Sequence, residues 1–281
     1  MDVLKRMNEA LRYIEEHITA EIDYKEAARQ AYCSEYHFKR LFSLLAGIPL
    51  SEYVRRRRLT LAAFDLQEQN VRVIDVAMKY GYHSPDAFTR AFQNMHGVTP
   101  TEGRNEEGTL KAYPRLTFQL TIKGGTEMNY RIVQKEAFHV AGVKHQLKMI
   151  NGELSPSYDE IVNAIADETY AEMEQLSSGE PAGIVHVTAD YSEQKDGNAT
   201  LEQYIGAVTT AQQAEGYSVL HVPAFTWAVF TVEGSWEVVE SNWERIYSEW
   251  LPTATYELAE GPELLASVDN ASEIWIPVVK K

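Results

Sequence analysis

The chain has 281 residues, 44% of them hydrophobic, and a formal net charge of −15. This length predicts two domains, and the hydrophobic fraction is ordinary for chains that bury a core. No apolar run is long enough to span a bilayer, no signal peptide opens the chain, and the single cysteine excludes an internal disulfide, so we expect a cytoplasmic protein without a membrane partner.

The charge is unevenly distributed along the chain. Residues 1–104 hold 15 Lys and Arg against 14 Asp and Glu, a net +1, whereas the remainder holds 11 against 27, a net −16. Because the first part is nearly neutral, any affinity for nucleic acid must depend on where its basic side chains lie.

The first part contains a repeat with an offset of fifty positions. Eight pairs of identical residues share this offset without a gap: Ala27/Ala77, Tyr32/Tyr82, Ser34/Ser84, Phe38/Phe88, Arg40/Arg90, Phe42/Phe92, Gly47/Gly97 and Glu52/Glu102. A fixed period indicates one supersecondary unit used twice. Each copy predicts a short helix, a tight turn and a second helix.

In the first copy, a short helix is expected over 24–31 and a second over 35–46, capped by Ser34 and ended by Gly47. Its apolar residues fall on one stripe at helical spacing: Phe38, Leu41, Phe42 and Leu45. Its outward face carries four polar or aromatic side chains: Tyr36, Lys39, Arg40 and Ser43.

A longer helix over 50–69 is expected to join the copies. It contains four consecutive arginines, 55–58, which must point around the helix rather than along one face. They are interpreted as solvated, partly snorkelling side chains for at least half of the four, and the alternative is that one or two touch phosphate.

In the second copy, a short helix over 73–80 precedes a second that is capped by Ser84, begins at Pro85 and stops at Gly97. Its buried stripe is Phe88, Ala91, Phe92 and Met95. Its outward face carries Asp86, Thr89, Arg90 and Gln93. The arrangement is a pair of helix-turn-helix units, and the alternative is a helical repeat that binds protein.

The repeat resembles the AraC/XylS family of bacterial transcription regulators over residues 4–104. The second copy carries the closest likeness, in Ile74-Asp75-Val76-Ala77, Gly81-Tyr82, Phe88-Thr89-Arg90-Ala91-Phe92 and Gly97-Val98-Thr99-Pro100, although Gly103 replaces a usual tyrosine. The resemblance implies two recognition helices in successive major-groove segments of duplex DNA. Tyr36, Lys39 and Arg40 would then contact bases or phosphates in one segment, and Asp86, Thr89 and Arg90 in the other.

The two arginines at equivalent positions, Arg40 and Arg90, can each pair with a guanine. Asp86 either accepts from a cytosine, repels a wrong phosphate, or supplies charge at a helix N-terminus. Because the other outward residues differ between the copies, we expect a bipartite, asymmetric DNA site.

The second part begins after an expected linker, 105–127, which contains a possible strand at 116–122. The domain over 128–281 is expected to be α+β, with an antiparallel sheet and two helices on one face. The expected strands are 128–134, 138–147, 183–191, 201–211, 217–222, 225–232, 255–259, 263–269 and 272–279. The expected helices are 157–176 and 235–250.

This part resembles the GyrI-like effector-binding domain. The likeness lies in Val140-Ala141-Gly142-Val143, in 223–230, in 246–252 and in Glu273-Ile274-Trp275-Ile276-Pro277-Val278. It implies binding of a small, aromatic or cationic effector. Trp227 stands where a tyrosine is common, and Leu265 stands near the position of a frequent glutamate, which puts a two-carboxylate site in doubt.

Three residues are the candidate effector ligands: Glu273, Trp275 and Trp227. Glu273 and Trp275 alternate onto one face of the last strand, and a carboxylate among aromatic rings suits a cation. The alternative for Glu273 is a solvated strand carboxylate. Trp236, Trp243 and Trp250 are spaced by seven residues, which puts them on one helical stripe, and they are expected to pack a helix against the core.

The sequence therefore predicts a ligand-responsive, DNA-binding transcription regulator, for which a contact with RNA polymerase is also open. The alternative is a small-molecule hydrolase with Glu273 as general base. No nucleophile elbow, metal spacing or phosphate loop is present, so we expect neither an enzyme nor a cofactor or metal.

Overall fold

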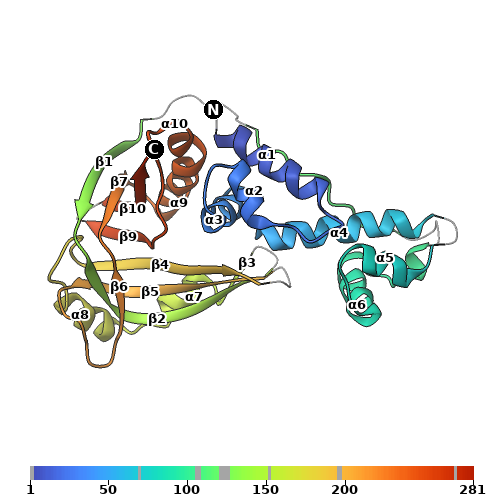
Figure 1. The fold of residues 1–281 in the computed structure, drawn as a ribbon. Helices are drawn as coiled ribbons and strands as arrows, with labels where there is room; N and C mark the ends of the chain where they lie inside the picture. Colours follow the sequence, from blue (N-terminus) through green and yellow to red (C-terminus); the bar gives the residue numbers. More distant parts are fainter. Residues whose placement is uncertain are drawn as a thin grey trace. The chain divides into compact units, whose positions relative to one another are not determined.

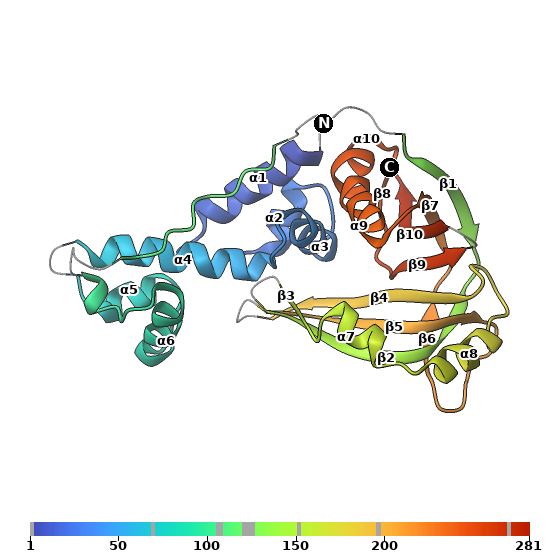
Figure 2. The same ribbon diagram turned by 180° about the vertical axis from the view of Figure 1, so that it is seen from behind.

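The computed structural model describes residues 3–68, 71–104, 109–119, 127–150, 153–194, 198–268 and 271–281. Contacts divide the chain into two compact units (Figures 1 and 2). The first contains 1–38 and 50–119, and the second contains 39–49 with nearly all of the chain from 120 onward. The boundary at residue 39 falls within the helix Glu35–Ala46, so residues 39–46 of this helix pack with the second unit.

The repeat region is helical, as the sequence predicts. Its elements in chain order are α1 (Val3–Glu16), α2 (Tyr24–Gln30), α3 (Glu35–Ala46), α4 (Leu50–Leu66), α5 (Val73–Lys79), α6 (Pro85–His96) and the 3-10 turn η1 (Glu102–Arg104). Gly47 and Gly97 follow α3 and α6 with φ of 69° and 82°, the left-handed conformation that suits glycine at a helix end.

The two copies differ by one residue in the turn, which corrects the gapless offset of fifty. In the first copy the amide of Cys33 donates to Ala28, and in the second the amide of Tyr82 donates to Ala77, an offset of 49. The recognition helices α3 and α6 keep the offset of fifty. The additional residue lies between Tyr82 and Ser84, so Ala28 rather than Ala27 is the structural equivalent of Ala77.

The four arginines of α4 are engaged rather than solvated. Arg55 and Arg56 both pair with the buried carboxylate of Glu52. Arg57 is held by Glu15 through two hydrogen bonds of 2.8 Å, and Arg58 donates to the backbone carbonyls of Ile18 and Ala20, which follow α1. Arg55 and Arg56 therefore pair within α4, whereas Arg57 and Arg58 connect α4 to α1 and to the segment that follows it.

The segment 109–119 forms no strand, and residues 120–122 of the possible strand lie outside the described residues. Side chains of the helices hold its backbone instead. The amides of Tyr113, Leu116 and Phe118 donate to Thr60, Tyr53 and Asn8, respectively. The predicted linker is thus packed along the first unit over this stretch.

The second unit contains one antiparallel sheet, as predicted. Its strands in the described residues are β1 (Asn129–Lys135), β2 (Phe138–Ile150), β3 (Glu153–Ser155), β4 (Ile184–Glu193), β5 (Ala199–Thr209), β6 (Ser218–Val222), β7 (Phe225–Glu233), β8 (Tyr256–Leu258), β9 (Glu263–Val268) and β10 (Ala271–Lys280). Their order is β1-β7-β10-β9-β4-β5-β2-β3, with β6 beside β2 and β8 beside β10. Gly142 and Gly206 face each other in β2 and β5, where an added Cβ would lie 2.1 Å from a carbonyl oxygen.

Both expected helices of this unit are interrupted. The first is α7 (Tyr158–Asn163) and α8 (Asp167–Gln175), separated by an extended residue, Ala166. The second is α9 (Trp236–Arg245), a π turn η2 (Ile246–Trp250) and α10 (Leu251–Thr253). The wider π turn rotates Trp250 relative to Trp236: Trp250 is buried, whereas Trp236 is 47% exposed, so the expected tryptophan stripe does not pack as one.

Alternation along the strands separates two environments. In β9, Leu264 and Ala266 belong to the main core cluster, together with Trp227, Trp275 and aliphatic residues of β4. Glu263 and Leu265 point to the opposite face, which carries α7 and α9. This second face holds the pocket described below.

Candidate functional site: two recognition helices and an acidic pocket

The outward face of α6 is open to solvent. Asp86, Arg90 and Gln93 are exposed and Thr89 is half-buried. Ser84 caps the helix by accepting from the amide of Ala87, and Phe88 and Phe92 are fully buried. No hydrogen bond or ion pair engages the side chain of Arg90 within the described residues, so this face is available to a partner.

The equivalent face of α3 is covered. Arg40 is 9% exposed and Ser43 is 5% exposed, while Tyr36 and Lys39 are half-buried. The hydroxyl of Ser43 donates to the sulfur of Met149 at 3.7 Å, and the Arg40 guanidinium lies 5.4 Å from the Tyr191 ring. The same helical frame therefore presents one open face and one engaged face.

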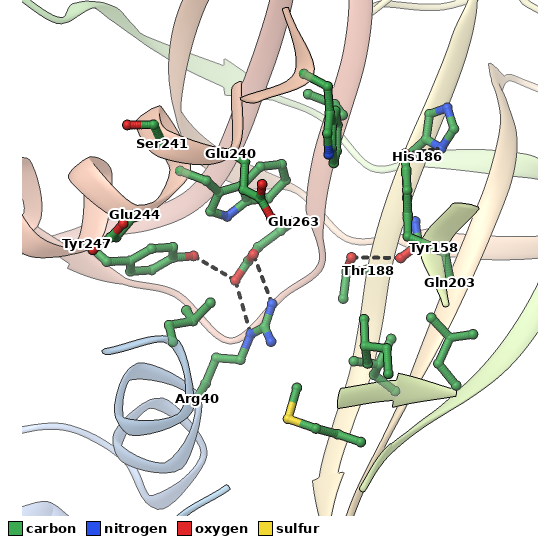
Figure 3. Close-up of a pocket in the computed structure, with 18 of the residues that line it drawn as sticks. Arg40, Tyr158, His186, Thr188, Gln203, Glu240, Ser241, Glu244, Tyr247 and Glu263 are labelled. Atoms are coloured by element: carbon green, nitrogen blue, oxygen red, sulfur yellow. Dashed lines mark hydrogen bonds and ion pairs between the residues drawn. The ribbon is translucent and has the colours of Figure 1, made fainter. Parts of the chain in front are cut away.

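Arg40 reaches into a pocket of about 690 Å³ on the helix side of the sheet (Figure 3). This volume lies within the range of small-molecule sites in proteins. The floor is formed by β2, β4, β5 and β9, and the walls by α7, α9 and the leucines of α3, Leu44 and Leu45. All of these residues belong to the second unit.

Glu263 is the buried carboxylate of this pocket, with 6% exposure. Its Oε1 accepts from the Tyr247 hydroxyl at 2.7 Å and from Nε of Arg40 at 3.3 Å, and its Oε2 accepts from Nη2 of Arg40 at 3.0 Å. Figure 3 shows the carboxylate between these two side chains. Burial, followed by the nearby Glu263 charge, raises the pKa of Tyr247 well above its usual value, so its hydroxyl stays a donor.

The opposite wall is aromatic and neutral. The Tyr158 hydroxyl lies 2.8 Å from Nδ1 of His186, and burial lowers the pKa of His186 to about 4. A neutral His186 can accept the tyrosine proton at Nδ1. The Tyr158 ring stacks on Trp236 with centroids 5.1 Å apart and planes at 7°. A flat apolar surface therefore spans α7 and α9.

The mouth of the pocket is acidic. Glu237, Glu240 and Glu244 of α9 line it and are exposed to solvent. Together with Glu263 they give four carboxylates among the lining residues, against the single guanidinium of Arg40. Like charges along a concave surface attract counterions of the opposite sign, so the pocket favours a cation.

The three residues predicted to bind an effector lie elsewhere. Glu273 is 9% exposed and forms a bidentate pair with Arg131, at 2.8 and 3.0 Å, and accepts from the Trp275 indole. Trp275 and Trp227 pack in the main core, where Trp227 is fully buried. The strand face that carries Glu273 and Trp275 is therefore closed by packing, and none of the three residues lines the pocket around Glu263.

Sequence reasoning missed Glu263. A signal was present, because Glu263 precedes Leu265 by two residues and so shares its face of β9. The doubt raised by Leu265 is removed in part, since the same strand face does carry a carboxylate. What the sequence could not show is that Arg40, 223 positions earlier, pairs with it.

The chain thus combines two helix-turn-helix units with a cavity whose volume is that of a small-molecule site. A family model described as a GyrI-like small molecule binding domain matches residues 128–279, and a helix-turn-helix domain model matches residues 27–106. Since the first match covers more than half of the chain, the chain belongs to the GyrI-like family, here joined to an AraC-type DNA-binding part.

Relatives match the helix-turn-helix part. The HTH-type transcriptional activator AarP of Providencia stuartii is 36% identical over 95 residues, which are 34% of this chain and 70% of that protein. The regulatory protein SoxS of Escherichia coli K12 is 31% identical over 101 residues, which are 36% of this chain and 94% of SoxS. The chain is therefore an AraC-type transcription regulator with a small-molecule-binding domain; the hydrolase alternative gains no support from these relatives.

Solved structures resemble the two parts separately. An AraC-type transcriptional regulator from Chromobacterium violaceum is 25% identical, covering 36% of this chain and 89% of that chain with a TM-score of 0.34. The structure of SAV2435 bound to tetraphenylphosphonium is 17% identical, covering 54% and 94% with a TM-score of 0.43. Within the described residues no helix is long and apolar enough to cross a membrane, and no cluster of three His, Cys, Asp or Glu could hold a metal ion.

Proposed function

We propose that the pocket around Glu263 is the effector site and that the effector is a small aromatic cation. The observation that carries this is the buried Glu263 carboxylate at a cavity of about 690 Å³ whose mouth holds three further glutamates. A buried carboxylate requires a positive or donating partner, and Arg40 now supplies it. The Tyr158–Trp236 stack offers the flat surface on which an aromatic group would pack.

The proposed DNA contacts are those of the two outward faces. Tyr36, Lys39, Arg40 and Ser43 would read one major-groove segment, and Asp86, Thr89, Arg90 and Gln93 the next. Because only the arginine is shared, the two segments should differ in sequence, which makes the site bipartite and asymmetric. Recruitment of RNA polymerase at such a site is a further proposal, supported by the relative AarP, which is named a transcriptional activator.

Calorimetric titration tests the effector site. Tetraphenylphosphonium is the cationic aromatic probe, and triphenylphosphine oxide is the neutral control of similar shape. We expect the cation to bind and the oxide not to bind. We expect Glu263→Gln to weaken the affinity for the cation by about tenfold or more, because one charged partner is lost. The matched variant is Glu273→Gln, which tests the carboxylate first favoured by the sequence; loss of binding there, with Glu263→Gln unaffected, would move the site to the core face.

Selection from random duplexes tests the DNA site. We expect two unlike half-sites with centres about one helical turn apart, since each recognition helix occupies one major-groove segment. A symmetric palindrome, or no sequence preference above non-specific binding at physiological salt, would contradict the proposed bipartite, asymmetric DNA site.

A further inference from the structure

We propose that Arg40 is an internal competitor of the effector: it occupies Glu263 when the pocket is empty, and an effector cation releases it to contact DNA. This inference rests on the proposed effector site and adds its regulation. It assigns one side chain, Arg40, to two alternative partners, the Glu263 carboxylate and a base or phosphate of DNA.

The Arg40–Glu263 ion pair uses the donor groups of Arg40 that a DNA contact would need. Two nitrogens of the Arg40 guanidinium face the two oxygens of Glu263 (Figure 3). Both residues are buried, with exposed fractions of 9% for Arg40 and 6% for Glu263. A guanidinium fork that faces a carboxylate in this way uses the same donors that pair with guanine O6 and N7. Arg40 therefore cannot hold Glu263 and read a guanine at the same time.

The charges that line the pocket leave room for one cation at Glu263. Among the pocket-lining residues, Arg40 is the one cation, and it lies at the most buried of the four carboxylates. A second cation placed on Glu263 beside Arg40 would be repelled, whereas removing Arg40 without replacement would leave a buried charge unpaired. The site is therefore stable with either cation and not with both or neither.

The two recognition helices differ in how their equivalent arginines are held. Arg90, the equivalent of Arg40 in α6, is exposed, and no hydrogen bond or ion pair holds its side chain within the described residues. The second helix-turn-helix unit is thus ready to bind DNA, while the first is held. Effector and DNA both favour the state in which Arg40 has left Glu263, so each should tighten the binding of the other by the same factor.

DNA affinity, measured by fluorescence anisotropy at fixed salt on the selected duplex, tests the competition. We expect tetraphenylphosphonium to tighten binding by the wild-type protein about tenfold, within the usual range of allosteric coupling. Glu263→Gln, which cannot form the ion pair, should bind DNA that tightly without the cation and should not respond to it. Glu249→Gln is the control, because Glu249 pairs with Arg245 and lines no part of the pocket; it should behave like wild type.

Effector affinity tests the same competition without DNA. Arg40→Met keeps the aliphatic stem but removes the competing charge, so we expect it to bind tetraphenylphosphonium about tenfold more tightly than wild type, the factor lost to the competitor. Unchanged or weaker binding by Arg40→Met, or an unchanged DNA affinity of Glu263→Gln, would overturn the competition. The expected gains in cation affinity of Arg40→Met and in DNA affinity of Glu263→Gln can both be absent while the cation still binds the wild-type pocket. That outcome would reject the competition and leave the proposed effector site standing. If the cation does not bind, the effector site fails, and the DNA affinity of Glu263→Gln still decides whether Arg40 is held.

Discussion

The two recognition helices, α3 and α6, show how one repeated sequence pattern can give two different surfaces. Both are twelve residues long, both bury two phenylalanines completely, and both carry an arginine at the sixth position. Arg90 is exposed, whereas Arg40 is buried against Glu263. The difference arises outside the repeat, because the carboxylate that holds Arg40 lies on β9.

A local sequence pattern specifies which face a helix buries but not what its other face contacts. The caps, the apolar stripe and the arginine position are set within a few residues. Whether that arginine is available to DNA depends on a strand more than two hundred residues away. Variants at equivalent positions of α3 and α6 can measure how far the likeness of the two helices extends.

The largest expected effect concerns the shared scaffold. Phe38→Ala and Phe88→Ala each remove a fully buried ring, and each should lower the free energy of unfolding by about 3–5 kcal/mol. Denaturant unfolding measures both, with Phe→Leu at each position as a milder control. A loss at one position several times larger than at the other would show that the two copies are not equivalent even in their cores.

The next effect is confined to the surroundings of α3. Burial lowers the pKa of His186 to about 4, so the folded state stays neutral while the unfolded state takes up a proton below its ordinary pKa of about 6.5. The stabilising effect is complete above pH 6.5 and is lost as the pH falls toward 4, up to about 3 kcal/mol. His186→Phe should remove this part of the pH dependence, measured as the difference in unfolding free energy from wild type at pH 7 and pH 4.5.

The comparison with His186→Phe is needed because another histidine whose pKa is lowered by burial, His96, lies in the first unit. Burial also lowers the pKa of His96, which accepts from the amide of Lys111. Its contribution has the same sign, so the wild-type pH curve alone would not identify His186. An identical pH dependence in wild type and His186→Phe would show that His186 carries none of it.

The third prediction compares the two arginines on DNA. Without an effector, Arg90→Ala should weaken binding to the selected duplex by about 1–3 kcal/mol, because a base-pairing guanidinium is lost. Arg40→Ala should have little effect under the same conditions, since Arg40 is held by Glu263. Anisotropy titrations at one salt concentration give both values. Equal losses would mean that the buried state of Arg40 does not persist on DNA.

The smallest expected effect concerns the caps. Ser84 accepts from the amide of Ala87 at 3.4 Å and Ser34 from the amide of His37 at 3.3 Å. Ser→Ala at either position should cost about 1 kcal/mol of stability, as is usual for an N-cap. Thermal unfolding of both variants, with Ser→Asp as the control that restores an acceptor, checks whether the two caps contribute equally.

Much of the fold could be predicted because it follows from short-range pattern. The ends of α3 match the expected helix, and the expected strands of the second part match β1, β2, β4, β5 and β7 to within a few residues. The errors fall where packing overrides pattern. The helix expected over 157–176 breaks at Ala166, and the expected tryptophan stripe is divided by a π turn.

The candidate sites were predicted less completely. Asp86, Arg90 and Gln93 on the outward face of α6 are exposed as expected, Thr89 is half-buried, and the DNA contacts of all four stay a prediction. For the effector, alternation placed Glu273 and Trp275 on one strand face correctly, but that face is packed as core. Strand alternation separates two faces without saying which one the rest of the chain covers.

Short-range pattern predicts the repeat, its helix caps, the arginine at the same position of both recognition helices and the antiparallel second part, because each depends on residues close together in the chain. The folded chain alone shows that Arg90 is exposed while Arg40 is held by Glu263, and that Glu263 rather than Glu273 lines the pocket. The physical reason is that an ion pair and a buried face depend on which distant strands and helices meet, and no local spacing in the sequence records that.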